Sequence, residues 1–132
     1  MVRDMAPDAP RPTPGELEIL GVLWDHGPST VREIHERLAK DRPTGYTTVL
    51  KLLQIMTEKG LVSRDEAARA HVYEARAPQE QTQRQLVRDL LDRAFGGSAT
   101  KLVMQALSAR KAPREELARI RELLDRLEGG ER

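Results

Sequence analysis

Apolar residues recur at helical spacing in the middle of the chain, between Thr44 and Leu61. With about 100° between successive helical residues, Val49, Leu53 and Met56 share one side and predict a stripe that packs on a protein core. The other side of this predicted helix is polar and carries Thr47, Lys51, Gln54 and Glu58, with Thr48 and Ile55 next to them. Hydroxyls, an amide and a cation suit the base edges and phosphates of a DNA major groove, but an ordinary solvated helix face has the same pattern.

Two shorter helices are predicted ahead of this segment. The first begins in the run Thr13-Pro14-Gly15-Glu16, where a hydroxyl, a proline and a glutamate satisfy the free amide groups of a helix start. It ends at Gly27-Pro28, and its apolar residues, which we expect in the core, are Leu17, Leu20, Leu23 and Trp24. The run Thr30-Val31-Arg32-Glu33 repeats the capping pattern and starts a second helix that ends near Lys40. Two short helices before a third with a polar outer face are typical of a helix-turn-helix.

Two short β-prone runs follow, Leu61–Asp65 and His71–Ala75, and they predict a hairpin. A hairpin directly after such a helix is a wing. Arg64 and Arg69 lie on it, where arginines reach backbone phosphates or the minor groove. The alternative is that both arginines are solvated surface charges.

Leucine-rich helical patterns occupy residues 79–132. One helix is predicted from Gln79 to the break at Gly96-Gly97, a second from Thr100 to Leu107, and a third after Pro113. About fifty residues in three helices cannot bury this many apolar side chains alone, so we expect a second copy of the chain to cover them. The residues expected at this dimer interface are Leu86, Val87, Leu90, Leu91, Phe95, Leu102, Val103, Leu107, Ile120, Leu123, Leu124 and Leu127.

The fold class predicted from these patterns is mainly α with a small β-hairpin. Residues 1–12 contain three prolines and no periodic pattern, and we expect a disordered arm there. Residues 13–78 form the predicted winged helix-turn-helix, and residues 79–132 the three-helix dimerisation region. A length of 132 residues suits one domain with an appendage or two small units, and 3% aromatic residues argue against a large sheet.

Composition excludes several functional classes. The absence of cysteine rules out disulfides, thiolate metal sites and a cysteine nucleophile. His26, His35 and His71 lack the spacing of a metal-dependent hydrolase, and no glycine-rich phosphate loop occurs, so neither an enzyme nor a cofactor is predicted. The sequence shows no signal peptide and no apolar stretch of about 18 residues, so we expect a cytoplasmic protein.

The charge balance gives limited support to DNA binding. The formal net charge is only +1, whereas DNA-binding domains are often strongly basic. Residues 42–76 hold six Lys and Arg against four Asp and Glu. Any basic surface must therefore be local.

From Pro12 to Glu128 the chain resembles the penicillinase repressor family of the BlaI/MecI type. The segments that carry the resemblance are Thr13 to Leu20 with Leu23-Trp24, Thr30 to Ile34, Tyr46 to Leu50, Glu58 to Val62, and Leu90 to Gly97. The resemblance implies a winged helix, a helical dimerisation region, and repression of an operator with two-fold symmetry, such as that of a β-lactamase gene. It also implies release by proteolysis through a membrane sensor that carries a metalloprotease domain.

Carried over by position, the resemblance implies DNA contacts from Tyr46, Thr47, Thr48 and Lys51 on the third helix and from Arg64 and Arg69 on the wing. Gln54, on the same polar face, joins the candidate DNA-binding residues. Ile55 departs from the family pattern, which often has arginine there. The scissile bond would fall near Gln105-Ala106, where the better-known members have an Asn-Phe pair. The cysteine pairs of copper-responsive members are absent, so copper sensing is rejected.

We therefore predict a homodimeric repressor that binds a palindromic operator in double-stranded DNA and uses no small-molecule cofactor. Two alternatives stay open. The near-neutral N-terminal region also suits a winged helix that binds another protein, and a ligand-gated regulator would need an apolar pocket that few aromatic residues are present to build.

Overall fold

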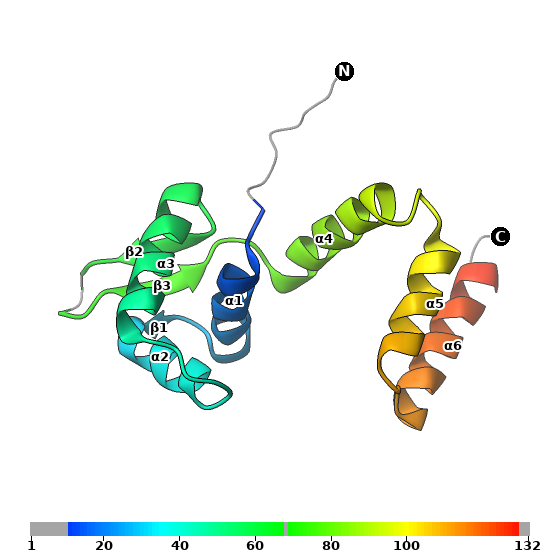
Figure 1. Ribbon diagram of the computed structural model, residues 1–132, viewed down its shortest axis with the longest axis horizontal. Helices are drawn as coiled ribbons and strands as arrows, with labels where there is room; N and C mark the ends of the chain where they lie inside the picture. Colours follow the sequence, from blue (N-terminus) through cyan, green and yellow to red (C-terminus); the bar gives the residue numbers. More distant parts are fainter. Residues whose placement is uncertain (1–10, 68, 130–132) are drawn as a thin grey trace, which may run out of the picture. The chain divides into compact units, whose positions relative to one another are not determined.

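The computed structural model describes residues 11–67 and 69–129, and most of the arm expected at residues 1–12 lies outside them. The described residues divide into two compact units after Leu86, within a helix. The boundary expected from the sequence, after Pro78, coincides with the start of that helix at Gln79. The elements, shown in Figure 1, are α1 (Pro14–His26), β1 (Ser29–Thr30), α2 (Val31–Ala39), α3 (Tyr46–Lys59), β2 (Val62–Asp65), β3 (Val72–Ala75), α4 (Gln79–Arg93), α5 (Ala99–Ala109) and α6 (Arg114–Gly129).

Both predicted capping boxes are present. The Thr13 amide donates to Glu16 Oε1 at 2.9 Å, and the Glu16 amide donates to Thr13 Oγ1 at 3.3 Å. At the start of α2, Thr30 and Glu33 exchange the same pair of bonds at 2.8 and 3.2 Å. These bonds satisfy amide groups that have no partner within the helix, which explains why α1 and α2 begin at these residues.

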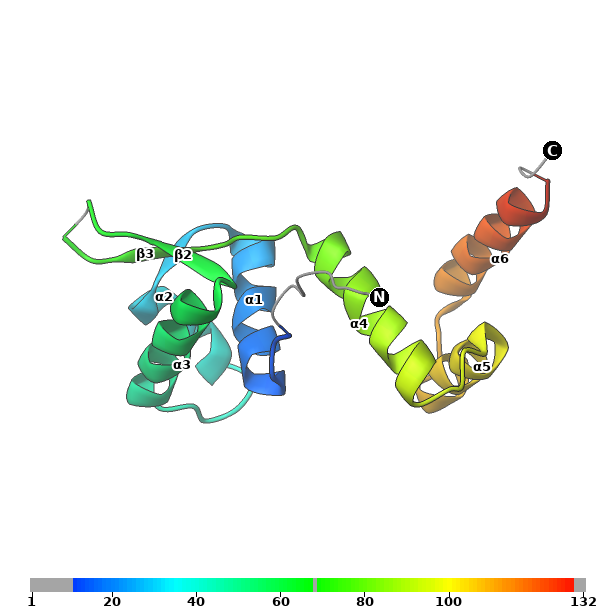
Figure 2. The ribbon, with the colours of Figure 1, turned by 90° about the horizontal axis from the view of Figure 1, so that it is seen from above.

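The predicted hairpin is confirmed, and β3 lies between β2 and a third strand, β1, that the sequence did not predict. All pairs are antiparallel: Arg64 lies opposite Tyr73 in the β2–β3 pair, and Thr30 lies opposite Val72 in the β1–β3 pair. Because β1 has two residues, it is too short to show an alternating pattern. Figures 1 and 2 show the hairpin extending beyond α2 and α3.

The core of the first unit lies between three helices and the sheet. The predicted α3 stripe is confirmed, because Val49, Leu53 and Met56 are fully buried. Trp24 is only partly buried, and its indole nitrogen donates to the carbonyl oxygen of Ala77 at 3.0 Å. The other core residues are Ile19, Leu20, Leu23, Val31, Ile34, Val62 and Tyr73.

The second unit contains little that is buried. Gly96 and Gly97 have φ values of 57° and 81°, a left-handed conformation that favours glycine and ends the helical run. Ser98 caps α5 by accepting from the Lys101 amide at 3.1 Å. No described residue of α5 or α6 is buried. Within the described ranges, no helix is both long and apolar enough to cross a membrane.

Candidate nucleic-acid interface

One face of α3 gathers the polar residues singled out from the sequence. Tyr46 is 48% exposed at the first residue of the helix, and Thr47, Thr48, Lys51 and Gln54 are exposed as well. The neighbouring Val49 and Leu53 are completely buried. The helix is thus fixed from behind by the core, and its polar face is open to a partner.

The turn before α3 is held by His35, a half-buried residue of α2. Its Nε2 donates to the carbonyl oxygen of Thr44 at 2.7 Å. Its ring also meets the ring of Tyr46 edge to face, with 5.7 Å between centroids and 79° between planes, a favourable aromatic geometry. His35 therefore fixes the position at which α3 begins.

The other end of α3 is tied to α1 by a charge pair. Lys59 Nζ donates to Glu16 Oε1 at 2.7 Å, and Glu16 is only 2% exposed. Burial by itself raises the pKa of Glu16, but hydrogen bonds from Lys59 and Thr13 and the charge of Lys59 together lower that pKa below its ordinary value of 4.5. After Lys59, Gly60 ends the helix with φ of 84°, as its sequence position predicts.

The two wing arginines differ in their surroundings. The Arg64 guanidinium pairs with Glu66 at 2.5 Å. Hydrogen bonds with the Tyr73 hydroxyl and with Glu66 raise the pKa of Arg64 above its ordinary value. Arg69 is exposed and forms no ion pair with any described residue. Of the two, Arg69 is the arginine whose charge remains available.

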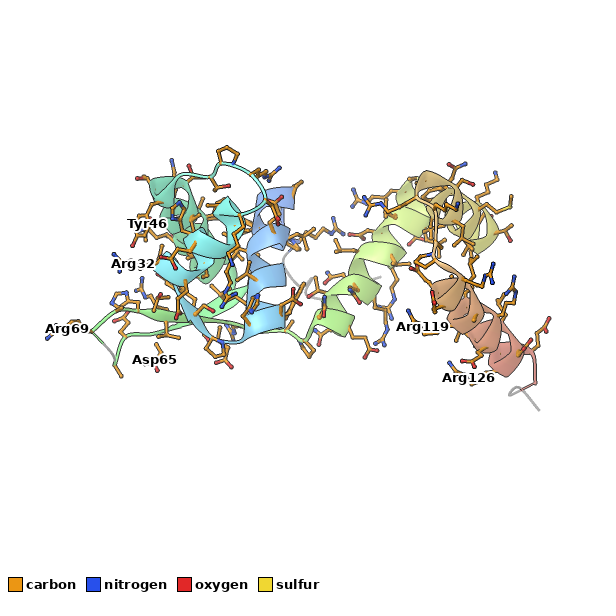
Figure 3. All side chains as sticks on the ribbon, turned by 90° about the horizontal axis from the view of Figure 1, so that it is seen from below. Arg32, Tyr46, Asp65, Arg69, Arg119 and Arg126 are labelled. Atoms are coloured by element: carbon orange, nitrogen blue, oxygen red, sulfur yellow. The ribbon has the colours of Figure 1, made fainter. Side chains whose placement is uncertain are left out.

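An open groove with a volume of about 500 Å³ separates the start of α2 from the wing. Its polar lining includes Arg32 from α2, Tyr46 from α3, and Arg69 and His71 from the wing. Figure 3 shows Arg32 and Tyr46 on the same edge of this unit, with Arg69 at the end of the hairpin. Neither Arg32 nor His71 was predicted at a binding site, because Arg32 stands in a helix-capping pattern and His71 in a β-prone run.

Most residues expected at a dimer interface keep exposed apolar side chains. The exposed ones are Val87, Leu90, Val103, Leu107, Leu123, Leu124 and Leu127. The partly buried ones are Leu86, Leu91, Phe95, Leu102 and Ile120. Met104, which the sequence reasoning passed over, is 61% exposed on α5, beside the exposed residues Gln105 and Ala106.

The chain matches a family model described as "Penicillinase repressor" over residues 12–126. It is 42% identical over 62 residues to "Transcriptional regulator BlaI" of Mycobacterium tuberculosis, a match that covers 45% of each chain and so less than half of that relative. It is 22% identical over 116 residues to "Penicillinase repressor" of Bacillus licheniformis, covering 88% of this chain and 91% of that protein.

Two solved structures are also similar. The solution structure of the DNA binding domain of the repressor BlaI covers 55% of this chain and 88% of that chain, with 24% identity and a TM-score of 0.49. The crystal structure of transcriptional regulator Tm0710 from Thermotoga maritima covers 89% of this chain and 74% of that chain, with 20% identity and a TM-score of 0.45.

Proposed function

The chain belongs to the penicillinase repressor family of transcriptional regulators, and on this premise we propose that it represses transcription as a homodimer bound to a palindromic operator. The observation that carries the proposal is the contrast along α3 between the completely buried Val49, Leu53 and Met56 and the exposed polar residues of the opposite side. A helix fixed in this way can enter a major groove without disturbing the core.

We assign roles to the exposed residues by their chemistry. Thr47, Thr48 and Gln54 carry short donors and acceptors suited to base edges. Lys51 and Arg69 carry charges suited to phosphates or to guanine, and Arg64 contributes less because Glu66 already pairs with it. Tyr46 lies at the edge of this surface, where its hydroxyl can reach the DNA backbone.

The homodimer is proposed from the apolar side chains of the second unit. Leu123, Leu124 and Leu127 are 45%, 54% and 55% exposed on α6. Moving such side chains out of water stabilises an association by about 25 cal/mol for each Å² of apolar surface. A symmetric dimer would place two α3 helices one DNA turn, roughly 34 Å, apart, which matches a two-fold operator.

Release of the operator is proposed to follow proteolysis in α5, near Gln105-Ala106, by a membrane sensor with a metalloprotease domain. Both residues are exposed, and α5 buries none of its side chains in one copy. Within one copy, a segment with so few buried contacts opens locally at low free energy, which a protease requires, so we expect cleavage when the two copies separate. A cut here would separate α6 from the DNA-binding unit and weaken the dimer.

The proposal is tested with a labelled duplex from the chain's own upstream region and a scrambled duplex of equal length, by fluorescence anisotropy at 50 to 200 mM salt. We expect tighter binding to the upstream duplex and a steep loss of affinity as salt rises. Lys51→Ala should weaken binding by roughly 1 to 3 kcal/mol, whereas Lys40→Ala, at the exposed C-cap of α2, should not. Equal, salt-independent binding to both duplexes would contradict the proposal and favour a protein partner.

A further inference from the structure

Pairing of β1 with β3 brings the start of α2 next to the wing. Thr30, the last residue of β1, lies opposite Val72. Arg32 follows Thr30 by two residues, and His71 directly precedes Val72. The sheet therefore brings Arg32 of α2 and His71 of the wing to the same groove, although 39 positions of sequence separate them.

The groove is cationic. Arg32 and Arg69 line it, and no carboxylate does. Neither arginine forms an ion pair or a side-chain hydrogen bond with another described residue, in contrast to Arg64. Both guanidinium groups are therefore free to pair with an anion from outside the protein.

The capping interactions of α2 leave Arg32 without an ion-pair partner among the described residues. Thr30 and Glu33 bond to each other's amides, so the acidic residue nearest to Arg32 in sequence is already engaged in the helix cap. Arg32 lies between these two residues with an exposed side chain. Its guanidinium can therefore turn toward a ligand without breaking a contact of the fold.

We propose that Arg32 binds a phosphodiester of the DNA backbone where the duplex passes this groove, next to the contact proposed for Arg69 at the end of the wing. The inference rests on the proposed function and adds a contact from α2 to those of α3 and the wing. Guanidinium groups bind phosphate oxygens through two parallel hydrogen bonds, and such bonds are among the strong ones in proteins. Tyr46, at the boundary between the groove and the polar face of α3, links this phosphate site to the surface that reads bases. Figure 3 shows the three labelled side chains.

The test compares Arg32→Ala, Arg69→Ala and the double variant with the unaltered full chain, on the upstream and scrambled duplexes, across the same range of salt. A lost phosphate contact lowers the slope of log affinity against log salt by about one, and lowers affinity for both duplexes by the same factor. We expect this for each single variant and a loss of about two for the double variant. Arg37→Ala is the matched control, because Arg37 lies on the same helix but bonds His26 at 3.3 Å.

Different outcomes separate the inference from the proposed function. A normal slope for Arg32→Ala, while Lys51→Ala still weakens binding, would overturn the inference and leave the proposed function intact. If the unaltered chain shows no salt-dependent binding to either duplex, both the inference and the proposed function are overturned. A free anion is tested without DNA. If millimolar inorganic phosphate raises the melting temperature of the unaltered chain but not of Arg32→Ala, and Arg32→Ala keeps the normal salt slope on both duplexes, the groove holds a soluble phosphate and the assignment to the DNA backbone is wrong.

Discussion

Glu16 and Glu33 occupy the same position in two capping boxes but have different surroundings. Each accepts a hydrogen bond from the amide of its capping threonine, at 2.9 and 2.8 Å. Glu16 is buried and also accepts from Lys59, whereas Glu33 is exposed. Replacing each glutamate by alanine removes the same capping bond, but only Glu16→Ala also removes the tie between α1 and α3.

The structure sets the difference expected between the two variants. Loss of the capping bond should lower the free energy of unfolding by about 1 kcal/mol in both. Loss of the bond to Lys59 adds about 1.5 to 3 kcal/mol, the range for bonds to charged groups. Lys59 is 31% exposed, so water partly solvates it after the change, and the lower part of this range applies. We expect about 2.5 kcal/mol for Glu16→Ala and about 1 kcal/mol for Glu33→Ala.

Urea unfolding followed by the fluorescence of Trp24 measures this difference. Trp24 is the single tryptophan, and it packs against the core of the first unit, so its signal follows the unit that holds both glutamates. Equal losses for the two variants would refute the reasoning, since they would mean that the bond to Lys59 contributes nothing. A loss above about 1 kcal/mol for Glu33→Ala would equally contradict it.

Further outcomes follow from the same contacts. The pKa of Glu16 is lower in the folded protein, so ionised Glu16 stabilises the fold fully above the ordinary value of 4.5, and this stabilisation is lost as pH falls through the folded pKa. The unfolding free energies of the unaltered chain and Glu16→Gln should therefore converge in acid. A constant difference down to full protonation would contradict this. His35→Ala removes the bond to Thr44 and the contact with Tyr46, and should weaken binding to the upstream duplex more than Lys40→Ala does, as measured by anisotropy. Gly60→Ala should destabilise the protein by about 1 kcal/mol because of the φ of 84°, and not through a clash, since the added carbon would come no closer than 3.8 Å to Arg76. Gly21→Ala, within α1 and with open space around it, should instead stabilise the protein by up to about 1 kcal/mol in the same urea experiment. Leu124→Asp should shift sedimentation of the full chain toward the mass of one copy, and an unchanged dimer would place the interface elsewhere.

Local signals in the sequence predicted much of the first unit. A threonine followed three residues later by glutamate marked the starts of α1 and α2, and Gly60 marked the end of α3. These features act within one helical turn, so neighbouring residues are enough to identify them. The buried stripe of α3 was predicted for the same reason, and its polar face followed as the opposite side.

Contacts between distant segments were not predictable in this way. Glu16 and Lys59 are 43 positions apart, and no local pattern pairs them. Arg32 lines the groove because β1 pairs with β3, and β1 is too short to be recognised from its sequence. Both wing arginines were treated alike, and the difference between them comes from the positions of Glu66 and Tyr73 beside Arg64.

Gly45, the N-cap of α3, provides no side chain to bond the first turn, unlike the threonines before α1 and α2. Its φ of −74° is one that any residue adopts, and an added carbon would meet Thr48 at an ordinary 3.7 Å. A serine or aspartate would fit there and would strengthen the helix by a few tenths of a kcal/mol relative to glycine, roughly the known difference between these caps. It would also engage the amides of Thr47 or Thr48 on the exposed face. The protein thus leaves a gain in folding stability unused at the helix proposed to meet DNA. Thermostable variants selected without a binding screen would accumulate changes at this position, and we expect them to lose part of the proposed DNA binding.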